Sequence, residues 1–295
     1  PRTLKYRPPR VTPKPVISGI QTAVVTGPSG EEIHTDEYGR IKVQFYWDRQ
    51  GKKDDKSSCW MRVAQPTAGG GWGSFFLPRV GFEVVVSFLE GDPDRPLVTG
   101  CVYNSTNKPA KAMPANKTQS GIRSNSTKGG SGFNEIRFED KKGEEHMFIH
   151  SQKNKTEIVN QDVAYEVGGS EELYITGDRT VSIGGSEDID LAGDRTEKIG
   201  GSLTSMVGAV RAEITGGHQL VQVAGAYGLI VGSVAVIEAG SGLILKGPGG
   251  FIAIGPSGID IMGTMVKINS GGAASPAQKP QQKAPKKAKK AAMRD

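Results

Sequence analysis

Apolar and polar positions in the N-terminal part of the chain follow a period of two. Short runs in which apolar residues alternate with polar ones are typical of β-strands. The predicted strands are 16–25, 41–47, 59–64, 82–89 and 97–103. Turn-forming stretches rich in glycine, proline and aspartate separate them, such as 27–30 and 91–96. Five or six short strands within residues 16–105 predict a small barrel, and an OB-fold topology is the natural expectation for it.

A second pattern, a glycine-centred repeat of eight residues, runs from Val167 to about Val231. Each unit places an aliphatic residue two positions before a small residue. The aliphatic members, here called the apolar row, are Val167, Ile175, Ile183, Leu191, Ile199, Val207, Val223 and Val231. The glycines that follow them, the corner glycines, are Gly169, Gly177, Gly185, Gly193, Gly201, Gly217 and Gly225. A fixed period of this kind predicts a stacked solenoid or fibre.

Eight residues suffice for a short strand and a corner, but not for a pair of helices. Apolar residues alternate before each corner, as Val181 and Ile183 do, which indicates one buried face. The corner itself calls for a positive φ or for close approach of another backbone. Ala209 and Ser233 replace glycine in two units, which suggests crowding as much as dihedral freedom.

The burial of these side chains is the difficulty, because a single chain with rungs this short has almost no interior. Three chains wound together solve it, since each supplies one unit per layer and the apolar row meets on a common axis. Closure also removes exposed strand edges. The predicted fold class is therefore all-β, a small OB-fold barrel followed by an intertwined triple-stranded β-helix, which is a homotrimeric needle.

The other segments are assigned from composition. Residues 1–15 are predicted to be a linker, 106–132 a linker or neck, 133–270 the needle, and 271–295 a disordered tail rich in lysine, proline and alanine. Charged residues become rare after residue 219, which favours a narrow, dry tip. The predicted docking residues of this tip are Ile259, Ile261, Val266 and Ile268.

The formal net charge of +6 belongs to the tail. Acidic and basic residues cancel in the rest of the chain, so the body lacks the basic excess of a nucleic-acid-binding protein. Within the tail, the predicted partner-binding residues are Lys286, Lys287, Lys289 and Lys290. Three interpretations of the tail remain open: a solvated extension, a contact with nucleic acid or anionic lipid, and a site for an acidic effector or adaptor.

No catalytic constellation is found in the sequence. A nucleophile elbow, a His-Glu-x-x-His motif and a phosphate loop are all missing, so we expect no enzymatic activity and no cofactor. No metal site is expected either, although His146 and His150 would share a strand face and a trimer axis could gather three copies of one histidine. Cys59 and Cys101 are predicted to be buried free thiols on strands.

The barrel and needle together resemble the C-terminal half of VgrG, the valine-glycine-repeat spike proteins of bacterial type VI secretion. The similar stretches are 19–25, 35–45, 57–65, 91–96, 133–140 and 256–259, and the resemblance covers residues 16–270. It implies a homotrimer related to the needle of contractile phage tails, with an OB-fold collar between an N-terminal base and the needle. Because the chain begins at Pro1, we expect that base to lie in a preceding segment.

The resemblance also implies partners. Such trimers sit on a tube of Hcp rings, carry a PAAR-repeat protein at the tip, and pierce a target membrane without binding it stably. An effector or adaptor could bind through the tail. The spike would be assembled in the bacterial cytoplasm and then secreted by the type VI machinery into the extracellular space or a target cell.

Three other functions are open to the same residues. The first is a phage-like tail spike with lytic activity, and the second is an OB-fold nucleic-acid-binding module with a fibrous stalk. The third is a trimeric adhesin. The near-zero charge of the body argues against the second, and no region is long and non-repetitive enough to hold the hydrolase of the first.

Overall fold

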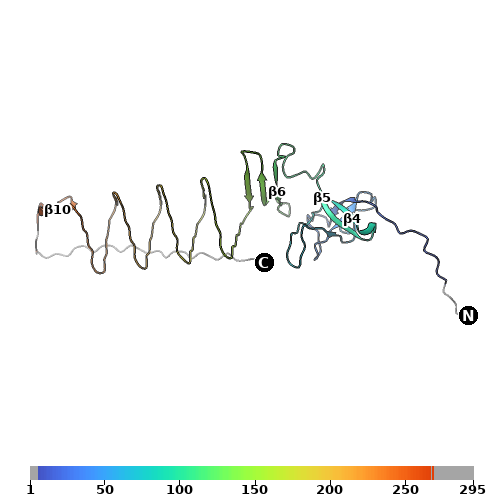
Figure 1. Cartoon of the computed structure of the whole chain (residues 1–295), viewed down its shortest axis with the longest axis horizontal. Helices are drawn as coiled ribbons and strands as arrows, with labels where there is room; N and C mark the ends of the chain where they lie inside the picture. Colours follow the sequence, from blue (N-terminus) through green and yellow to red (C-terminus); the bar gives the residue numbers. More distant parts are fainter. Residues whose placement is uncertain (1–5, 267, 269–295) are drawn as a thin grey trace. The chain divides into compact units, whose positions relative to one another are not determined.

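The computed structural model describes residues 6–266 and 268, and these residues form two compact units that divide after Gln161. Regular structure is almost entirely β, as Figure 1 shows. The one helical segment among the described residues is the 3-10 turn η1, Leu89–Gly91. None of the described helices is long and apolar enough to cross a membrane. The predicted all-β class is confirmed.

Unit 1 begins with a five-stranded sheet in the order β2-β1-β4-β5-β3. Its strands are β1 (Gln21–Thr26), β2 (Lys42–Phe45), β3 (Arg62–Val63), β4 (Glu83–Phe88) and β5 (Pro96–Val102). The pairing of β3 with β5 is parallel, and the other pairs are antiparallel. Ile41, just before β2, and Met61, just before β3, exchange two backbone hydrogen bonds of 3.0 and 2.8 Å. This bridge joins the two outer strands, so the sheet closes into a small barrel.

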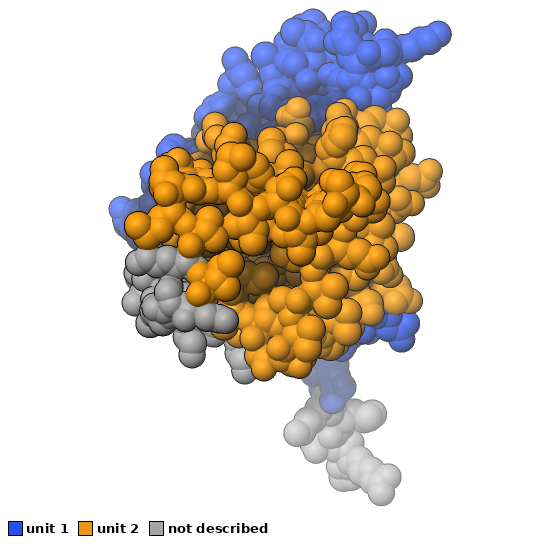
Figure 2. Space-filling view, turned by 90° about the vertical axis from the view of Figure 1, so that its left-hand side faces the viewer, with its two compact units in different colours: residues 1–161 blue, residues 162–295 orange. Residues whose placement is uncertain are grey.

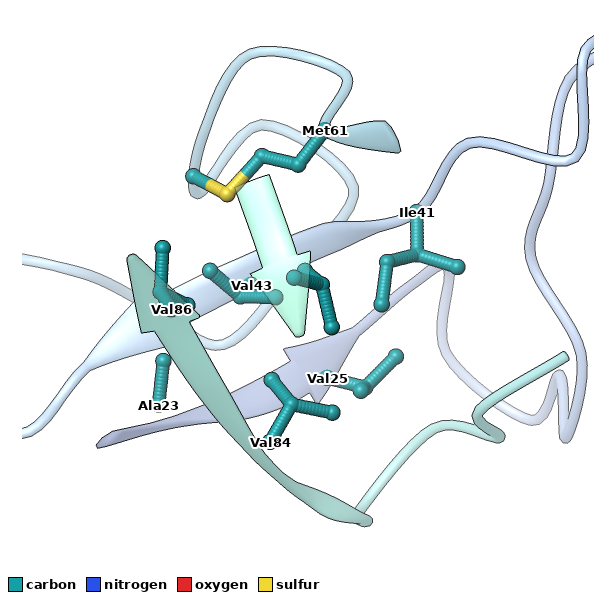
Figure 3. Packing of buried hydrophobic residues seen from close by; sticks show 8 residues of the cluster. Ala23, Val25, Ile41, Val43, Met61, Val84 and Val86 are labelled. Atoms are coloured by element: carbon teal, nitrogen blue, oxygen red, sulfur yellow. The ribbon is translucent and has the colours of Figure 1, made fainter. Parts of the chain in front are cut away.

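The core of the barrel consists of small aliphatic side chains at alternate positions of the strands. Val25, Val84, Val86 and Val98 point into the same interior and are at most 1% exposed. Figure 3 shows how side chains from β1, β2 and β4 converge beneath Met61. The period of two in the sequence therefore becomes one closed apolar interior within a single chain.

A second sheet of unit 1 contains β6 (Gln119–Arg123), β7 (Glu135–Glu139) and β8 (His146–His150) in sequential antiparallel order. The structure differs here from the sequence prediction, because β6 lies inside the segment 106–132 that was assigned as a linker. Ile122 is the one large apolar residue of β6, so the strand has no alternating pattern of its own. It forms because β7 supplies the neighbouring edge.

After β8 comes a stretch in which no strand pairs with another part of the same chain, and most of it belongs to unit 2. This stretch, residues 152–241, is called the repeat segment, although its first ten residues belong to unit 1. The backbone bends at residues 168–169, 176–177 and 184–185, and this eight-residue interval persists to 240–241. Between bends the chain is extended, and Figure 1 shows it running back and forth.

The far end of unit 2 returns to ordinary pairing. Strands β9 (Leu243–Gly247), β10 (Gly250–Gly255) and β11 (Gly258–Gly263) form an antiparallel meander in the order β11-β10-β9. Gly250, at φ +158°, starts β10 where an added Cβ would lie 2.1 Å from the backbone oxygen of Met262. Close approach of two strands therefore requires glycine at this position.

The two cysteines are free, as predicted, but the expectation that they are buried is wrong. Cys59 and Cys101 are both free and both exposed in the single chain. Cys101 lies in β5 and pairs with the buried Val84 of β4, but the residues of β5 after Val98 are all exposed. Partial burial against its surroundings still raises the pKa of the Cys101 thiol.

Candidate interaction surfaces

The apolar row of the repeat segment is only half covered in the single chain. Its eight side chains are between 44% and 54% exposed, and the apolar residues two positions before them, such as Val181 and Ile189, are about 60% exposed. In an extended segment both positions point to the same side. The repeat therefore presents to solvent a row of aliphatic side chains, beside a second apolar row that Glu197 and Ser205 interrupt. A monomeric protein does not normally leave such a surface uncovered.

The surface of unit 2 is correspondingly hollowed, as the space-filling view in Figure 2 shows. One open recess of about 430 Å³ is lined by Val221, Val223, Gly225 and Tyr227, residues of two successive units of the repeat. Because apolar side chains line this recess, apolar side chains of another molecule with the same eight-residue spacing would fill it.

The corner glycines do not have the positive φ that the sequence suggested for them. Each lies in a bend, yet an added Cβ at Gly169, Gly185 or Gly201 would meet no atom of the same chain within 4 Å. Neither backbone conformation nor crowding within one chain explains these residues. The remaining reason for a small residue is the approach of something outside the chain.

The charged residues of the repeat pair within one unit of the same chain. Arg195 lies 3.6 Å from Glu197, and Arg211 lies 3.5 Å from Glu213. All four side chains are more than half exposed, so each pair contributes little to stability and mainly keeps this surface solvated.

The predicted tip residues divide into two groups. Ile259 and Ile261 lie in β11 on the same sheet face as Ile252 and Ile254 of β10, because directly opposed residues of antiparallel strands share a face. Val266 and Ile268 follow the sheet and are 48% and 77% exposed. Ile261 and Val266 line one open recess, so the two groups meet there in the single chain. The tail lysines predicted to bind a partner lie outside the described residues.

The sheet β6–β8 has one charged face and one apolar face. On the charged face, Glu135 is 5% exposed and lies 2.9 Å from Arg137, 3.5 Å from Lys111 and 3.7 Å from Arg123. These residues line a recess of about 290 Å³ whose other walls include Tyr103 and Met113. On the opposite face, the register pairs Ile122 with Ile136, Ile136 with Ile149, and Phe138 with Met147. The amino-acid sequence does not predict this double-faced sheet, because β6 carries a single apolar residue.

The aspartate and histidine side chains that were considered as catalytic or metal-binding candidates make contacts within turns and with aromatic rings. Asp92 accepts the backbone N–H of Asp94 at 3.0 Å in the predicted turn, and Lys14 donates to it. His150 contacts the carbonyl oxygen of Phe133 through Nδ1 at 3.0 Å. Among the residues that the structure describes, no three His, Cys, Asp or Glu side chains are grouped closely enough to hold a metal ion.

Carboxyl groups with a lowered pKa lie in unit 1 and anchor loops. Burial opposes the shift at Asp36, but hydrogen bonds from Arg40 and Tyr38 lower the pKa of its carboxyl. A hydrogen bond from Lys14 lowers the pKa of Asp92, and the backbone N–H of Gly129 lowers that of Glu32. A general acid at neutral pH needs a raised pKa, so the lowered values do not favour that role for these groups.

Comparison with known families gives two matches in chain order. Residues 22–103 match the type VI secretion system/phage-baseplate injector OB domain. Residues 120–231 match the bacteriophage T4 gp5 C-terminal trimerisation domain. The first match covers the barrel, and the second covers β6–β8 and most of the repeat segment.

Curated relatives are spike proteins. The type VI secretion system spike protein VgrG4b of Pseudomonas aeruginosa is 56% identical over 163 residues, which are 55% of this chain and 20% of that protein. VgrG5 of the same organism is 51% identical over 178 residues, 60% of this chain and 22% of that protein. The actin cross-linking toxin VgrG1 of Vibrio cholerae is 38% identical over 278 residues, 89% of this chain and 22% of that protein. The chain therefore spans about a fifth of the length of these relatives.

Proposed function

Because the chain belongs to the VgrG family of type VI secretion spike proteins, we propose that it is the barrel-and-needle part of a homotrimeric spike that pierces a target membrane mechanically. The exposed apolar row carries this proposal. Burying one such aliphatic side chain stabilises a protein by about 2 kcal/mol. Two further copies of the chain, aligned layer by layer, would bury every member of the row in all three chains.

The same arrangement supplies the missing backbone partners. Strand layers in a sheet lie about 4.8 Å apart, and each extended part of the repeat has free edges within its own chain. Pairing with neighbouring copies would give the backbone N–H and C=O groups of these edges hydrogen-bond partners. The closed assembly would then have no exposed strand edges along the repeat. The stiffness that a spike needs would then come from hydrogen bonds between chains and a dry apolar axis.

The proposed partners lie at the two ends of the trimer. A tube of Hcp rings would adjoin the base that precedes this chain, and a PAAR-repeat protein would dock at the end formed after β11. The exposure of Val266 and Ile268 supports a contact there. The tail, residues 271–295, would recruit an effector or adaptor.

The proposed role is structural rather than enzymatic. The spike would assemble in the cytoplasm and leave the cell through the type VI machinery. The cross-linking activity in the name of the Vibrio cholerae relative is that protein's own, and this chain matches 22% of it. A phage-like lytic spike remains the second candidate, because the phage-baseplate OB model matches the barrel.

A chimera tests the proposal. In a bacterium with an active type VI system, residues 16–270 replace the matching segment of its VgrG spike protein. Hcp release into the medium should persist, and it should be lost with Ile183→Asp in the same chimera. A chimera that forms stable trimers but releases no Hcp would contradict the proposed function. Peptidoglycan turnover by the purified chain would favour the lytic spike.

A separate experiment addresses the tail. The complete chain and a chain ending at residue 270 are used as baits in parallel pull-downs. An effector or adaptor bound by the complete chain alone is the expected result. Equal recovery with both baits would remove the tail from the proposal.

A further inference from the structure

A strictly periodic needle has a problem of alignment. If three copies of the repeat segment slip past one another by sixteen residues, every apolar residue of the row again meets an apolar or small one. Arg179, Arg195 and Arg211 also recur at this interval, so they do not mark a unique alignment. The repeat can therefore wind in several registers of similar energy, and something outside it has to select one.

Two non-periodic elements flank the repeat segment, namely the sheets β6–β8 and β9–β11. They differ in how their faces are divided. The face of β9–β11 with Ile252 and Ile261 is apolar, and the opposite face carries Phe251 and Met262 together with Lys246 and Asp260. Apolar and charged side chains therefore share one face of β9–β11, so its two faces are divided less sharply.

The sheet β6–β8 is divided sharply. Its charged face is covered by its own chain, since Glu135 is surrounded by three cationic groups and Arg137 lies 4.6 Å from the ring centre of Phe148. Its apolar face has no cover from its own chain. Its members are 42% to 59% exposed: Ile122, Ile136, Phe138, Met147 and Ile149.

We propose that this apolar face is a register clamp, which packs against the same face of two further copies and fixes the alignment of the three chains before the repeat winds. The inference rests on the proposed trimer and adds the element that aligns it. The face holds five large apolar side chains and no charged one, so an identical apolar face complements it. It is continuous with the repeat, because the first bend, at residues 152–153, follows β8 after a single residue.

Chains of two lengths test the clamp. Deleting residues 170–185 removes one sixteen-residue period and joins Gly169 to Ser186, which stand in the order that Gly169 and Ser170 have in the intact chain. Long and short chains are co-expressed with Cys59 and Cys101 replaced by serine. A single cysteine is placed either before the deletion, as Val159→Cys, or after it, as Ala239→Cys. Both sites continue the eight-residue spacing of the apolar row.

A bis-maleimide cross-linker then reports which ends are aligned. A clamp at β6–β8 predicts long–short cross-links through residue 159 and at least tenfold fewer through residue 239. The reverse ratio would place the alignment at β9–β11 and overturn the proposal. Equal yields at both sites, or complete sorting into long-only and short-only trimers, would overturn it as well.

Two controls separate the clamp from the trimer itself. Long chains alone should cross-link at both sites, and failure there would count against the proposed trimer rather than the clamp. Phe138→Asp should reduce long–short cross-linking at residue 159 at least tenfold, whereas Lys142→Asp in the exposed turn between β7 and β8 should not. An unchanged yield with Phe138→Asp, in a chain whose barrel keeps its circular dichroism, would overturn the clamp.

Discussion

The barrel and the repeat segment contain the same alternating residue types, but the aliphatic side chains are buried in the barrel and exposed in the repeat. Valine and isoleucine alternate with polar residues in both, yet Val84 is completely buried and Ile183 is 49% exposed. The difference lies in the turns. Barrel strands are joined by loops that lay each strand against an earlier one, whereas the corners of the repeat send the chain onward every eight residues. Alternation thus specifies a buried face, and the connections decide whose chain covers it.

The largest difference between the two regions is expected when a charge is placed on the apolar row. Ile183→Asp would place three carboxylates on the axis, and burying unpaired charges is prohibitively unfavourable. We expect loss of the trimer with the barrel intact, measured by size-exclusion chromatography with light scattering. The neighbouring Ser182→Asp, on the opposite side of the extended segment, should leave assembly unchanged. An intact trimer with Ile183→Asp would contradict the shared axis.

Truncation of one side chain in each region sharpens the comparison. Ile41→Ala removes a fully buried side chain from the barrel and should destabilise it by about 2–5 kcal/mol at any protein concentration. Ile183→Ala should instead lower a melting temperature that depends on concentration, because assembly and folding are coupled in the repeat. Denaturation series at several concentrations give both results. A concentration-independent loss with Ile183→Ala would mean that one chain buries this residue alone.

Glycine substitutions test whether the crowding at the corners comes from other chains. Gly185→Ala should be tolerated, as Ala209 is at an equivalent corner, whereas Gly185→Val should weaken the trimer by about 1–3 kcal/mol through overpacking. A Cβ at Gly185 has open space in the single chain, so a monomer would accept both substitutions equally. Equal trimer stability for the two variants would show that the corners are not crowded.

The smallest expected effect is on acid stability and should be confined to unit 1. Hydrogen bonds lower the pKa of Asp36 below its usual value of 3.8, so their contribution is present above that pH and is lost as the pH falls through the lowered value. Asp36→Asn should therefore lower the urea midpoint of the barrel slightly at pH 7 and not at all near pH 2. A difference that grows on acidification would have the wrong sign.

Much of this architecture could be predicted from the sequence. The five barrel strands lie within or beside the predicted segments, because turn residues and alternation are local signals. The strand β6 was missed, because Ile122 is its one apolar residue and its partner β7 determines its conformation. The burial of Cys101 was predicted wrongly, because its partner Val84 is buried but the end of β5 that carries Cys101 is exposed.

The interaction surfaces were harder to predict than the fold. The eight-residue period indicated an apolar row and the need for further copies, and the structure leaves that row uncovered by its own chain. The sequence attributed the corner glycines partly to positive φ, which they do not have. The division of β6–β8 into a charged and an apolar face depends on strand pairing across 119–150, so no local sequence pattern predicts it.

Amide hydrogen exchange across residues 152–241 tests the central claim, that the repeat obtains its interior and its strand partners from two other copies. The wild-type chain at high concentration should show slow exchange throughout this segment, although no strand of one chain pairs there. In the Ile183→Asp variant the same amides should exchange at nearly the rate of an unfolded chain, while barrel amides such as that of Val25 stay protected. Slow exchange of the repeat in a demonstrably monomeric chain would contradict the account.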